Sequence, residues 1–231
     1  MQRRRVLMAA GKKSRLPSGY REVAWIGQPS TLSAYINTNY IIQSGFSQFI
    51  CHSVTFLTNN SCHIMGVRKA ISGTANLVFG SNNANSSGIQ ALFIGSTWSA
   101  TREKVGLNMQ KKFTCEYENG LQRLLVDDVQ KIRTTYTNLN FNDFIEHPLF
   151  LFAANLGYRA NNVGTEDFAT INSGQIDILH DGDTARSLVP CVRENDDKPG
   201  MYDLAESICP LTNTPFYINA GSGEFTIGPN V

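Results

Sequence analysis

The sequence predicts an all-β protein, built as an antiparallel β-sandwich of two sheets. The first observation is an alternation of period two, in which Phe113, Cys115 and Tyr117 take turns with polar residues, as in a half-buried strand. The second is the Asn-Gly dipeptide at 119–120, after which the alternation resumes over 121–126; this is a strong hairpin signal. The third is that similar runs recur between turn-forming clusters without βαβ spacing, which favours antiparallel sheets.

The expected strands follow one another along the chain. They are residues 34–40, 48–57, 62–67, 76–79, 89–94, 104–109, 113–117, 121–126, 149–154, 175–179 and 187–192. The clusters that separate them are rich in Asn, Asp, Ser and Gly, at 58–61, 81–88, 161–162, 181–183 and 195–197. We expect a single short helical turn, at 140–147.

The chain divides into a short arm, residues 1–15, and one domain, residues 16–231. No repeat or Pro/Gly-rich linker splits the domain, and Pro-Ser-Gly at 17–19 predicts the turn that opens it. The longest apolar run, 149–154, is far shorter than the ~20 residues that cross a bilayer, so we expect no membrane insertion. The apolar run 6–10 is too short for a secretory signal, which predicts synthesis without export.

The net charge of +1 hides an uneven distribution. Of the 20 Lys and Arg, six lie in residues 1–16, which contain no acid, so the arm carries +6. They are Arg3, Arg4, Arg5, Lys12, Lys13 and Arg15. The other 14 stand against 19 Asp and Glu, which leaves the body at −5. Such an arm is suited to nucleic acid or to an acidic groove on a partner protein; a solubilising tail is the alternative.

The five cysteines are odd in number and widely spaced, without a C-x-x-C pair. Cys51-His52 and Cys62-His63 are adjacent pairs, but neighbours on a strand point to opposite faces and do not grip one zinc ion together. We therefore expect buried free thiols, no metal site and no cofactor. The loops 181–183 and 195–197 have the oxygen ligands that calcium prefers, but tight turns use the same residues.

The two ends of the domain resemble a known family. Residues 16–26 (LPSGYREVAWI) and 34–40 (AYINTNY) resemble the opening of a concanavalin A-like, or laminin G-like, jelly-roll domain. Val-Pro-Cys at 189–191, Gly-Met-Tyr-Asp-Leu at 200–204 and the glycine-rich tail 219–229 resemble its end. The resemblance spans residues 16–231 and implies two stacked antiparallel sheets. It also implies a place among bacteriophage virion proteins or surface proteins of gut bacteria.

Enzymatic chemistry is not expected. Gln175, Asp177 and His180 have the E-x-D-x-x-E spacing of endo-glucanases that share this fold, but Gln and His stand where two carboxylates belong. Glu116 and Glu118 face the same way on a strand, where solvated carboxylates are ordinary. The four histidines are scattered, and no nucleophile elbow or phosphate loop is present.

Glycan binding would need exposed aromatic rings beside polar side chains, because aromatic rings stack on sugar faces and amides bond sugar hydroxyls. The candidates are Trp98, Tyr158, Arg159, Asn161 and Asn162. The loop residues from Tyr158 onward are favoured, since Trp98 is also suited to the core of a sandwich.

The resemblance and the charge distribution together predict a non-enzymatic structural or accessory protein of a phage particle. It would be a capsid decoration, head-fibre or tail-appendage component in many copies, located in the virion, with the arm as its anchor to other virion proteins and with outward contact to host glycans. A carbohydrate-binding module or adhesin on a bacterial surface is the alternative. A glycoside hydrolase is the third possibility, and it lacks a carboxylate pair.

Overall fold

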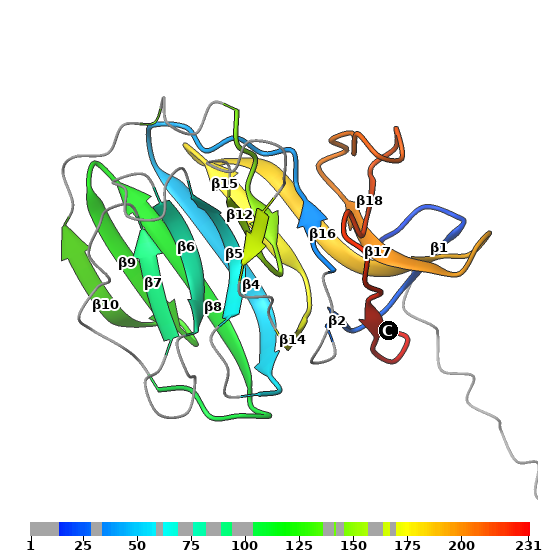
Figure 1. Cartoon of the computed structure of the whole chain (residues 1–231), viewed down its shortest axis with the longest axis horizontal. Coiled ribbons are helices and arrows are strands. Elements are labelled where there is room, and N and C mark those ends of the chain that lie inside the picture. The colour runs from blue at the N-terminus through cyan, green and yellow to red at the C-terminus, as the bar shows by residue number, and fades with distance from the viewer. Residues whose placement is uncertain are drawn as a thin grey trace, which may run out of the picture.

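The structure is a computed structural model of the chain. It describes residues 14–28, 34–58, 62–68, 76–81, 89–93, 104–135, 141, 146–156, 164–166 and 170–231. These residues form strands and no α-helix (Figure 1). The predicted all-β class is therefore confirmed, whereas the predicted helical turn at 140–147 lies mostly outside the described residues.

The strands form two sheets. The larger has β1 (Tyr20–Glu22), β2 (Ile26–Gly27), β4 (Ser47–Phe56), β8 (Gln110–Glu118), β9 (Leu121–Val126), β10 (Val129–Thr135), β14 (Ile171–Ser173), β15 (Ile176–His180), β16 (Asp183–Arg193), β17 (Lys198–Asp203), β18 (Phe216–Ile218) and β19 (Thr226–Ile227). The smaller has β3 (Ile36–Asn37), β5 (Cys62–Arg68), β6 (Asn76–Ser81), β7 (Ile89–Phe93), β11 (Phe150–Leu151), β12 (Ala154–Leu156) and β13 (Gly164–Glu166).

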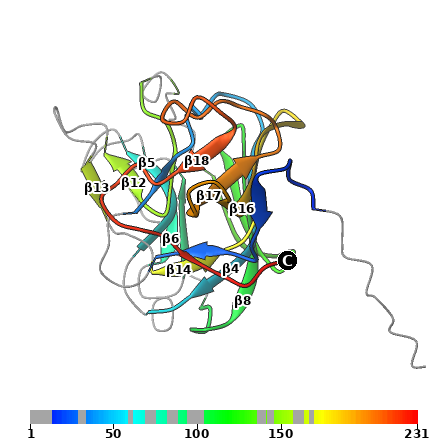
Figure 2. The same ribbon diagram turned by 90° about the vertical axis from the view of Figure 1, so that its right-hand side faces the viewer.

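The main path of the larger sheet runs β10-β9-β8-β4-β15-β16-β17-β18. The smaller sheet runs β13-β12-β5-β11-β3, with β6 and β7 added beside β5. The two sheets lie face to face, as Figures 1 and 2 show from perpendicular directions. All recorded pairings are antiparallel except β12 with β5. This is the two-sheet sandwich that the sequence predicts.

Side chains from both sheets meet in one hydrophobic core. Phe49, Phe113 and Ile176 from the larger sheet are at most 1% exposed. Phe79 of β6 packs against Phe113 of β8 with ring centroids 5.5 Å apart, which joins the layers. The alternation that predicted half-buried strands therefore has its cause here, because every second residue of β4 or β8 enters this core.

Three tight hairpin turns set the register of the larger sheet. Asn119 and Gly120 both have positive φ, 48° and 83°, as the type I′ turn between β8 and β9 requires. Asp181 and Gly182 do the same between β15 and β16. The turn at 127–128, with φ of 51° and 64°, uses two aspartates. The Asn-Gly prediction is confirmed, and the Asp-Asp turn was not predicted because it lacks glycine.

Two predicted strands are wrong in detail. Residues 104–109 form no strand, since Asn108 adopts a positive φ of 56° in a turn that precedes β8. The run 149–154 is broken at Phe152, whose φ is 66°. That bend separates β11, which is antiparallel to β5, from β12, which is parallel to it. Apolar content alone predicts burial here but not the break.

A second apolar cluster covers the outer face of β16 and β17. Leu16, Val189 and Phe216 are buried there, and the Tyr20 ring lies 4.8 Å from Tyr202 and 5.3 Å from Phe216. β1 pairs with β16 beside this cluster. The segment that follows the arm is thus fixed to the body by packing as well as by hydrogen bonds.

The cysteines agree with the sequence prediction where the structure describes them. Cys51, Cys115, Cys191 and Cys209 are buried free thiols. Burial raises the pKa of the Cys191 thiol to about 12 and that of the Cys51 thiol further, so neither is a thiolate at neutral pH. No helix in the described ranges is long and apolar enough to cross a membrane.

Candidate functional site

The predicted partner and glycan residues lie almost entirely outside the described part of the chain. Arg3, Arg4, Arg5, Lys12 and Lys13 of the arm, and Trp98, Tyr158, Arg159, Asn161 and Asn162 of the proposed glycan site, are in this group. They stay predictions. Arg15 is described, and it leads to a polar surface on the larger sheet.

The outer face of the larger sheet carries two adjacent rows of side chains. Directly opposed residues on neighbouring strands share a face. One row therefore runs Ser187, Asp177, Ile50, Thr114, Leu125 across β16, β15, β4, β8 and β9. The next runs Leu179, Gln48, Glu116, Arg123, Arg133 across β15, β4, β8, β9 and β10. Polar groups thus share one face of the sheet with the half-buried side chains of Ile50, Leu125 and Leu179, and we call this face the sheet-face site.

Asp177 is the centre of the first row. Its Oδ1 accepts hydrogen bonds from Gln175 Nε2 (2.9 Å) and Ser187 Oγ (2.8 Å), and its Oδ2 lies 2.6 Å from His52 Nε2. Burial raises the pKa of the Asp177 carboxyl, but the bonds from His52, Gln175 and Ser187 outweigh it and hold the pKa below its usual value. Asp177 is therefore an ionised acceptor, and its side chain is 17% exposed.

His52 is the outward partner of this carboxylate. Its side chain is 41% exposed, because β4 is irregular between Cys51 and Val54 and the alternation shifts there. The imidazole contacts Asp177, and within the described residues no hydroxyl or thiol is bonded to it. His52 is thus oriented to offer a ring nitrogen to solvent or ligand but has no nucleophile beside it.

Arg15 connects this cluster to the arm. Its guanidinium donates to both carboxylate oxygens of Glu22, and its Nη1 donates to Gln175 Oε1 over 2.7 Å. The bond to Glu22 is the largest cause that raises the pKa of Arg15. Since Gln175 in turn donates to Asp177, one chain of contacts runs from the base of the arm to the sheet-face site.

The second row has its own ion pair. Glu116 accepts from Gln48 Nε2 (2.9 Å) and lies 2.9 Å from Arg123 Nε. Glu118 is 49% exposed and 3.9 Å from Arg123 Nη2. The two glutamates share a face, as predicted from their spacing, and Arg123 lies between them. This arrangement fits a structural role better than a catalytic pair.

The three residues considered for a hydrolase, Gln175, Asp177 and His180, do not form one site. Gln175 and Asp177 bond each other on the outer face, whereas His180 at the end of β15 lies 3.4 Å from Ser47 and 3.4 Å from Asp181. A glutamine that donates to the only carboxylate of this trio is neither nucleophile nor proton donor.

In each of the two loops considered for calcium, one carboxylate is used in a local contact. Asp181 Oδ1 accepts the Phe46 amide over 2.8 Å. Asp196 accepts two hydrogen bonds from Arg193, at 2.9 and 2.6 Å. A search of the described ranges finds no group of three or more His, Cys, Asp or Glu placed to hold a metal ion.

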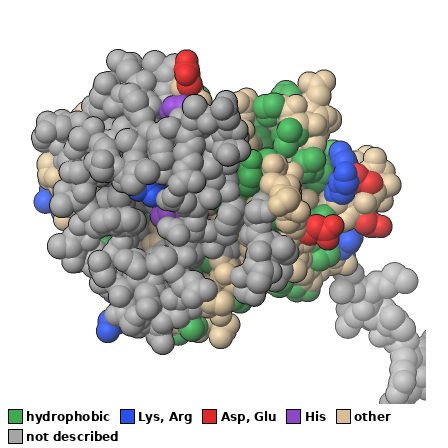
Figure 3. Space-filling model, in the orientation of Figure 1, with side chains coloured by type: hydrophobic (Ala, Val, Ile, Leu, Met, Phe, Trp, Pro, Cys, Tyr) green, Lys and Arg blue, Asp and Glu red, His purple; other side chains and the backbone are tan. Residues whose placement is uncertain are grey.

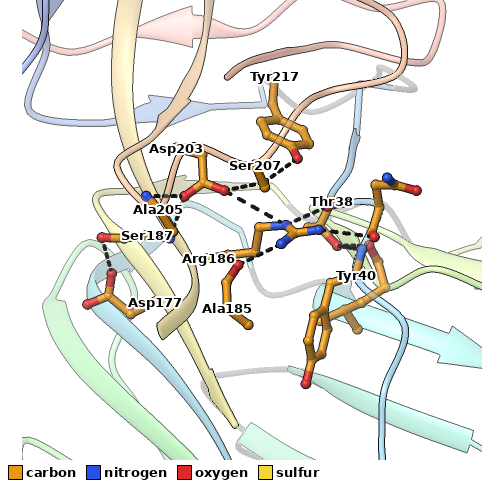
Figure 4. A network of polar contacts seen from close by, with 12 residues as sticks. Thr38, Tyr40, Asp177, Ala185, Arg186, Ser187, Asp203, Ala205, Ser207 and Tyr217 are labelled. Atoms are coloured by element: carbon orange, nitrogen blue, oxygen red, sulfur yellow. Dashed lines mark hydrogen bonds and ion pairs between the residues drawn. The ribbon is translucent and has the colours of Figure 1, made fainter. Parts of the chain in front are cut away.

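A second polar network lies inside the sandwich (Figure 4). Asp203 is fully buried and accepts from the amides of Ser187 (2.8 Å) and Ala205 (2.9 Å). Its other oxygen bonds Ser207 Oγ, which also lies 2.7 Å from the Tyr217 hydroxyl. Asp203 thus ties the loop after β17 to β16.

Arg186 extends this network to the smaller sheet. Its Nε lies 3.8 Å from Asp203 Oδ2 and donates to the Thr38 carbonyl over 2.9 Å, while Nη2 donates to the Asn39 carbonyl. Thr38 and Asn39 directly follow β3, so the guanidinium links the layers. Residues 200–204 are part of the family resemblance, but nothing in the sequence indicated that Arg186 pairs with Asp203.

Sequence reasoning also missed the sheet-face site. His52 was considered as a zinc ligand and as one of four scattered histidines, and the segment 175–180 as a strand with a failed hydrolase motif, but neither was considered as part of a shared site. Alternation does place Gln175 and Asp177 on one face. Their partners His52 and Ser187 become visible only with the strand register, which a single sequence does not specify.

No family model and no curated protein matches the chain. Solved structures do match. One is a structure from Bacteroides ovatus described provisionally as a carbohydrate binding protein, at 10% identity and a TM-score of 0.56, covering 90% of this chain and 60% of that one. Another is domains LG4-5 of the mouse laminin α1 chain, at 13% identity and a TM-score of 0.50, covering 83% of this chain and 48% of that one.

These likenesses show the fold. The chain has a concanavalin A-like, laminin G-like jelly roll, as the resemblance of its two ends implied. It spans about 60% and about half of the two matched chains.

Proposed function

We propose that this chain is a non-enzymatic carbohydrate-binding domain that holds a glycan on the sheet-face site. The observation that carries the proposal is the Asp177 cluster: an ionised carboxylate held by three side chains, one of which is the exposed His52. A pre-arranged group of donors and acceptors on a rigid sheet suits sugar hydroxyls, because it binds them without being ordered first.

The neighbouring side chains supply the remaining contacts of such a site. Ile50 and Leu179 are half-buried and lie beside Asp177 and Gln48 in the two rows. Aliphatic surface between hydrogen-bonding groups fits the C–H faces of a pyranose. The Bacteroides ovatus structure, with the same fold and a carbohydrate-binding description, supports this ligand class.

Binding without catalysis is supported by the same contacts. Asp177 is engaged by three side chains and Glu116 by Gln48 and Arg123. Retaining hydrolysis needs two carboxyl groups about 5 Å apart with separate roles as nucleophile and acid. In the first row Asp177 is the one carboxylate of its cluster, and in the second row Glu116 and Glu118 both face Arg123, which pairs with them.

The test is a glycan array followed by titration of the best ligand. We expect His52→Ala and Asp177→Asn each to weaken binding by about tenfold or more, since a lost hydrogen bond to a charged group has about this effect. Tyr158→Ala and Asn161→Ala test the loop predicted from the sequence. An array without binding above background contradicts the proposal, and loss of binding in the loop variants alone moves the site to that loop.

A second candidate function is attachment to a phage particle as a decoration, fibre or tail-appendage protein in the virion. One support is the resemblance of the two ends of the domain to virion proteins. The other is that Glu22 and Gln175 bind Arg15, which fixes the position where the arm joins the body. Deletion of residues 1–13 should abolish incorporation into particles and leave the fold intact. Normal incorporation of the truncated chain contradicts this role for the arm.

A further inference from the structure

A cleft of ≈ 580 Å³ lies at the end of the molecule that carries β17 and β18. Its apolar lining comprises Pro199, Ile218, Phe225 and Ile227, and Ile227 is 42% exposed. Neither polar row of the sheet-face site contributes to it. It is therefore a second concave surface, and we call it the apolar cleft.

Acidic side chains form part of the same lining. The lining has three acidic residues, Asp196, Asp197 and Glu224, and one basic residue, Lys198. Asp196 is paired with Arg193 and with Lys198, while Asp197 and Glu224 are exposed and form no ion pair with any described residue. Figure 3 shows acidic, basic and hydrophobic side chains close together at this end of the molecule. An occupant should accordingly be apolar and positively charged at once.

The arm of this chain has that composition. Residues 6–10 read Val-Leu-Met-Ala-Ala, with Arg3, Arg4 and Arg5 before them and Lys12 and Lys13 after them. The segment 3–13 therefore carries +5 without an acid, and its apolar middle is flanked by cations on both sides. The apolar lining of the cleft matches the apolar middle of the arm. The acidic side chains beside that lining match the basic residues on either side of the apolar middle.

The arm also joins the body close to the apolar cleft. Ser14 and Arg15 line a neighbouring cleft of ≈ 630 Å³ together with Glu194. Glu194 belongs to the turn between β16 and β17, as do Asp196 and Asp197 of the apolar cleft. The 13 residues before Ser14 span up to about 45 Å when extended, which is ample for this separation.

We propose that the apolar cleft is the docking site of the chain's own basic arm, residues 3–13. Val6, Leu7 and Met8 lie against Ile218, Phe225 and Ile227, and the flanking cations face Asp197 and Glu224. Tethering at Ser14 gives the arm a millimolar effective concentration, so modest contacts keep it docked. The arm is thereby stored on the body until a competing acidic partner takes it. This inference does not depend on glycan binding.

The experiment measures trypsin cleavage within the arm of the full-length protein, followed by mass spectrometry. Cleavage reports the undocked fraction when docking is fast. Asp197→Asn combined with Glu224→Gln should speed cleavage at Arg3 to Arg5 and at Lys12 and Lys13 by about threefold to tenfold. Asn tolerates the positive φ of 54° at position 197. Ile227→Ser should have a similar effect that persists in high salt, because it removes apolar contact.

The matched control is Asp128→Asn combined with Glu118→Gln. Like the cleft variant, it removes one Asp and one Glu charge, and Asp128 also has a positive φ, of 64°. Both residues flank β9 at the other end of the larger sheet. The arm of this control should be cleaved at the wild-type rate. The proposal is overturned if the wild-type arm is cut as fast as a free peptide of residues 1–16, or if the control is cut as fast as the cleft variant. Protection that disappears on dilution together with a dimer seen by light scattering would assign the arm to a second copy, which also overturns docking within one chain.

Discussion

Asp177 and Asp203 lie on neighbouring parts of one sheet and share a partner, yet they face different surroundings. Ser187 donates its amide to Asp203 and its hydroxyl to Asp177. The side chain of Asp203 is 0% exposed and that of Asp177 17%. Asp203 is bonded to its own loop, and Asp177 is bonded to the exposed His52.

The difference separates a structural carboxylate from one that is available to bind. A buried charge that loses its partners is left without solvation, so every contact of Asp203 is needed for the fold. A carboxylate at the surface can exchange a protein partner for water or for a ligand hydroxyl at small cost. The same residue type therefore serves stability inside the sandwich, while on the outer face it is available for the glycan contact that we propose.

The largest expected effect is that of Asp203→Ala. Arg186 would lose its buried counter-charge, and the amides of Ser187 and Ala205 would lose their acceptor. We expect a loss of about 3–5 kcal/mol in the free energy of unfolding, measured by urea denaturation. A loss below 1 kcal/mol would show that Asp203 is no more structural than a surface carboxylate.

A smaller effect is expected from the matched substitution Asp177→Ala. Gln175, Ser187 and His52 can turn to water, so the free energy of unfolding should fall by only about 1 kcal/mol. Glycan affinity should fall far more than stability, in the same titration that tests His52→Ala. An unfolding loss equal to that of Asp203→Ala would remove the distinction between the two aspartates.

The smallest effect concerns pH. Hydrogen bonds in the folded state hold the pKa of Asp177 below its usual value. Asp177 therefore stabilises the fold above the unfolded-state pKa of about 3.9 and loses this contribution as pH falls through the folded-state pKa. Urea denaturation at pH 7 and pH 3.5 should show the stability gap between wild type and Asp177→Asn narrowing at the lower pH. A gap that widens on acidification contradicts the assignment.

The fold was predictable because its signals are local. Alternation identified β4, β8 and β9, and Asn119-Gly120 identified a hairpin from two residues. Where the backbone departs from a local rule the prediction was wrong, as at Phe152, whose positive φ divides an apolar run into two strands. A phenylalanine in the sequence does not indicate a positive φ, so this bend could not be predicted.

The sheet-face site was not predictable, because it depends on pairing between distant segments. His52 and Asp177 are 125 residues apart, and Arg15 and Gln175 are 160 apart. The sequence of a strand indicates which of its residues share a face, but it does not indicate which other strand pairs with it. The arm was recognised from charge alone, and its role stays a prediction that the cleavage experiment addresses.

The last strand has a consequence for how the chain reaches its native state. β19 pairs with β2, through Thr226 with Gly27 and Ile227 with Ile26, and Val23 forms a bridge with Asn230. These contacts close a loop of about two hundred residues, which is entropically costly and slow. β2 therefore gains these partners only after residues 226–230 have been synthesised. Until then β2 is unpaired on the side that β19 takes, and an unpaired strand edge is open to pairing with another chain.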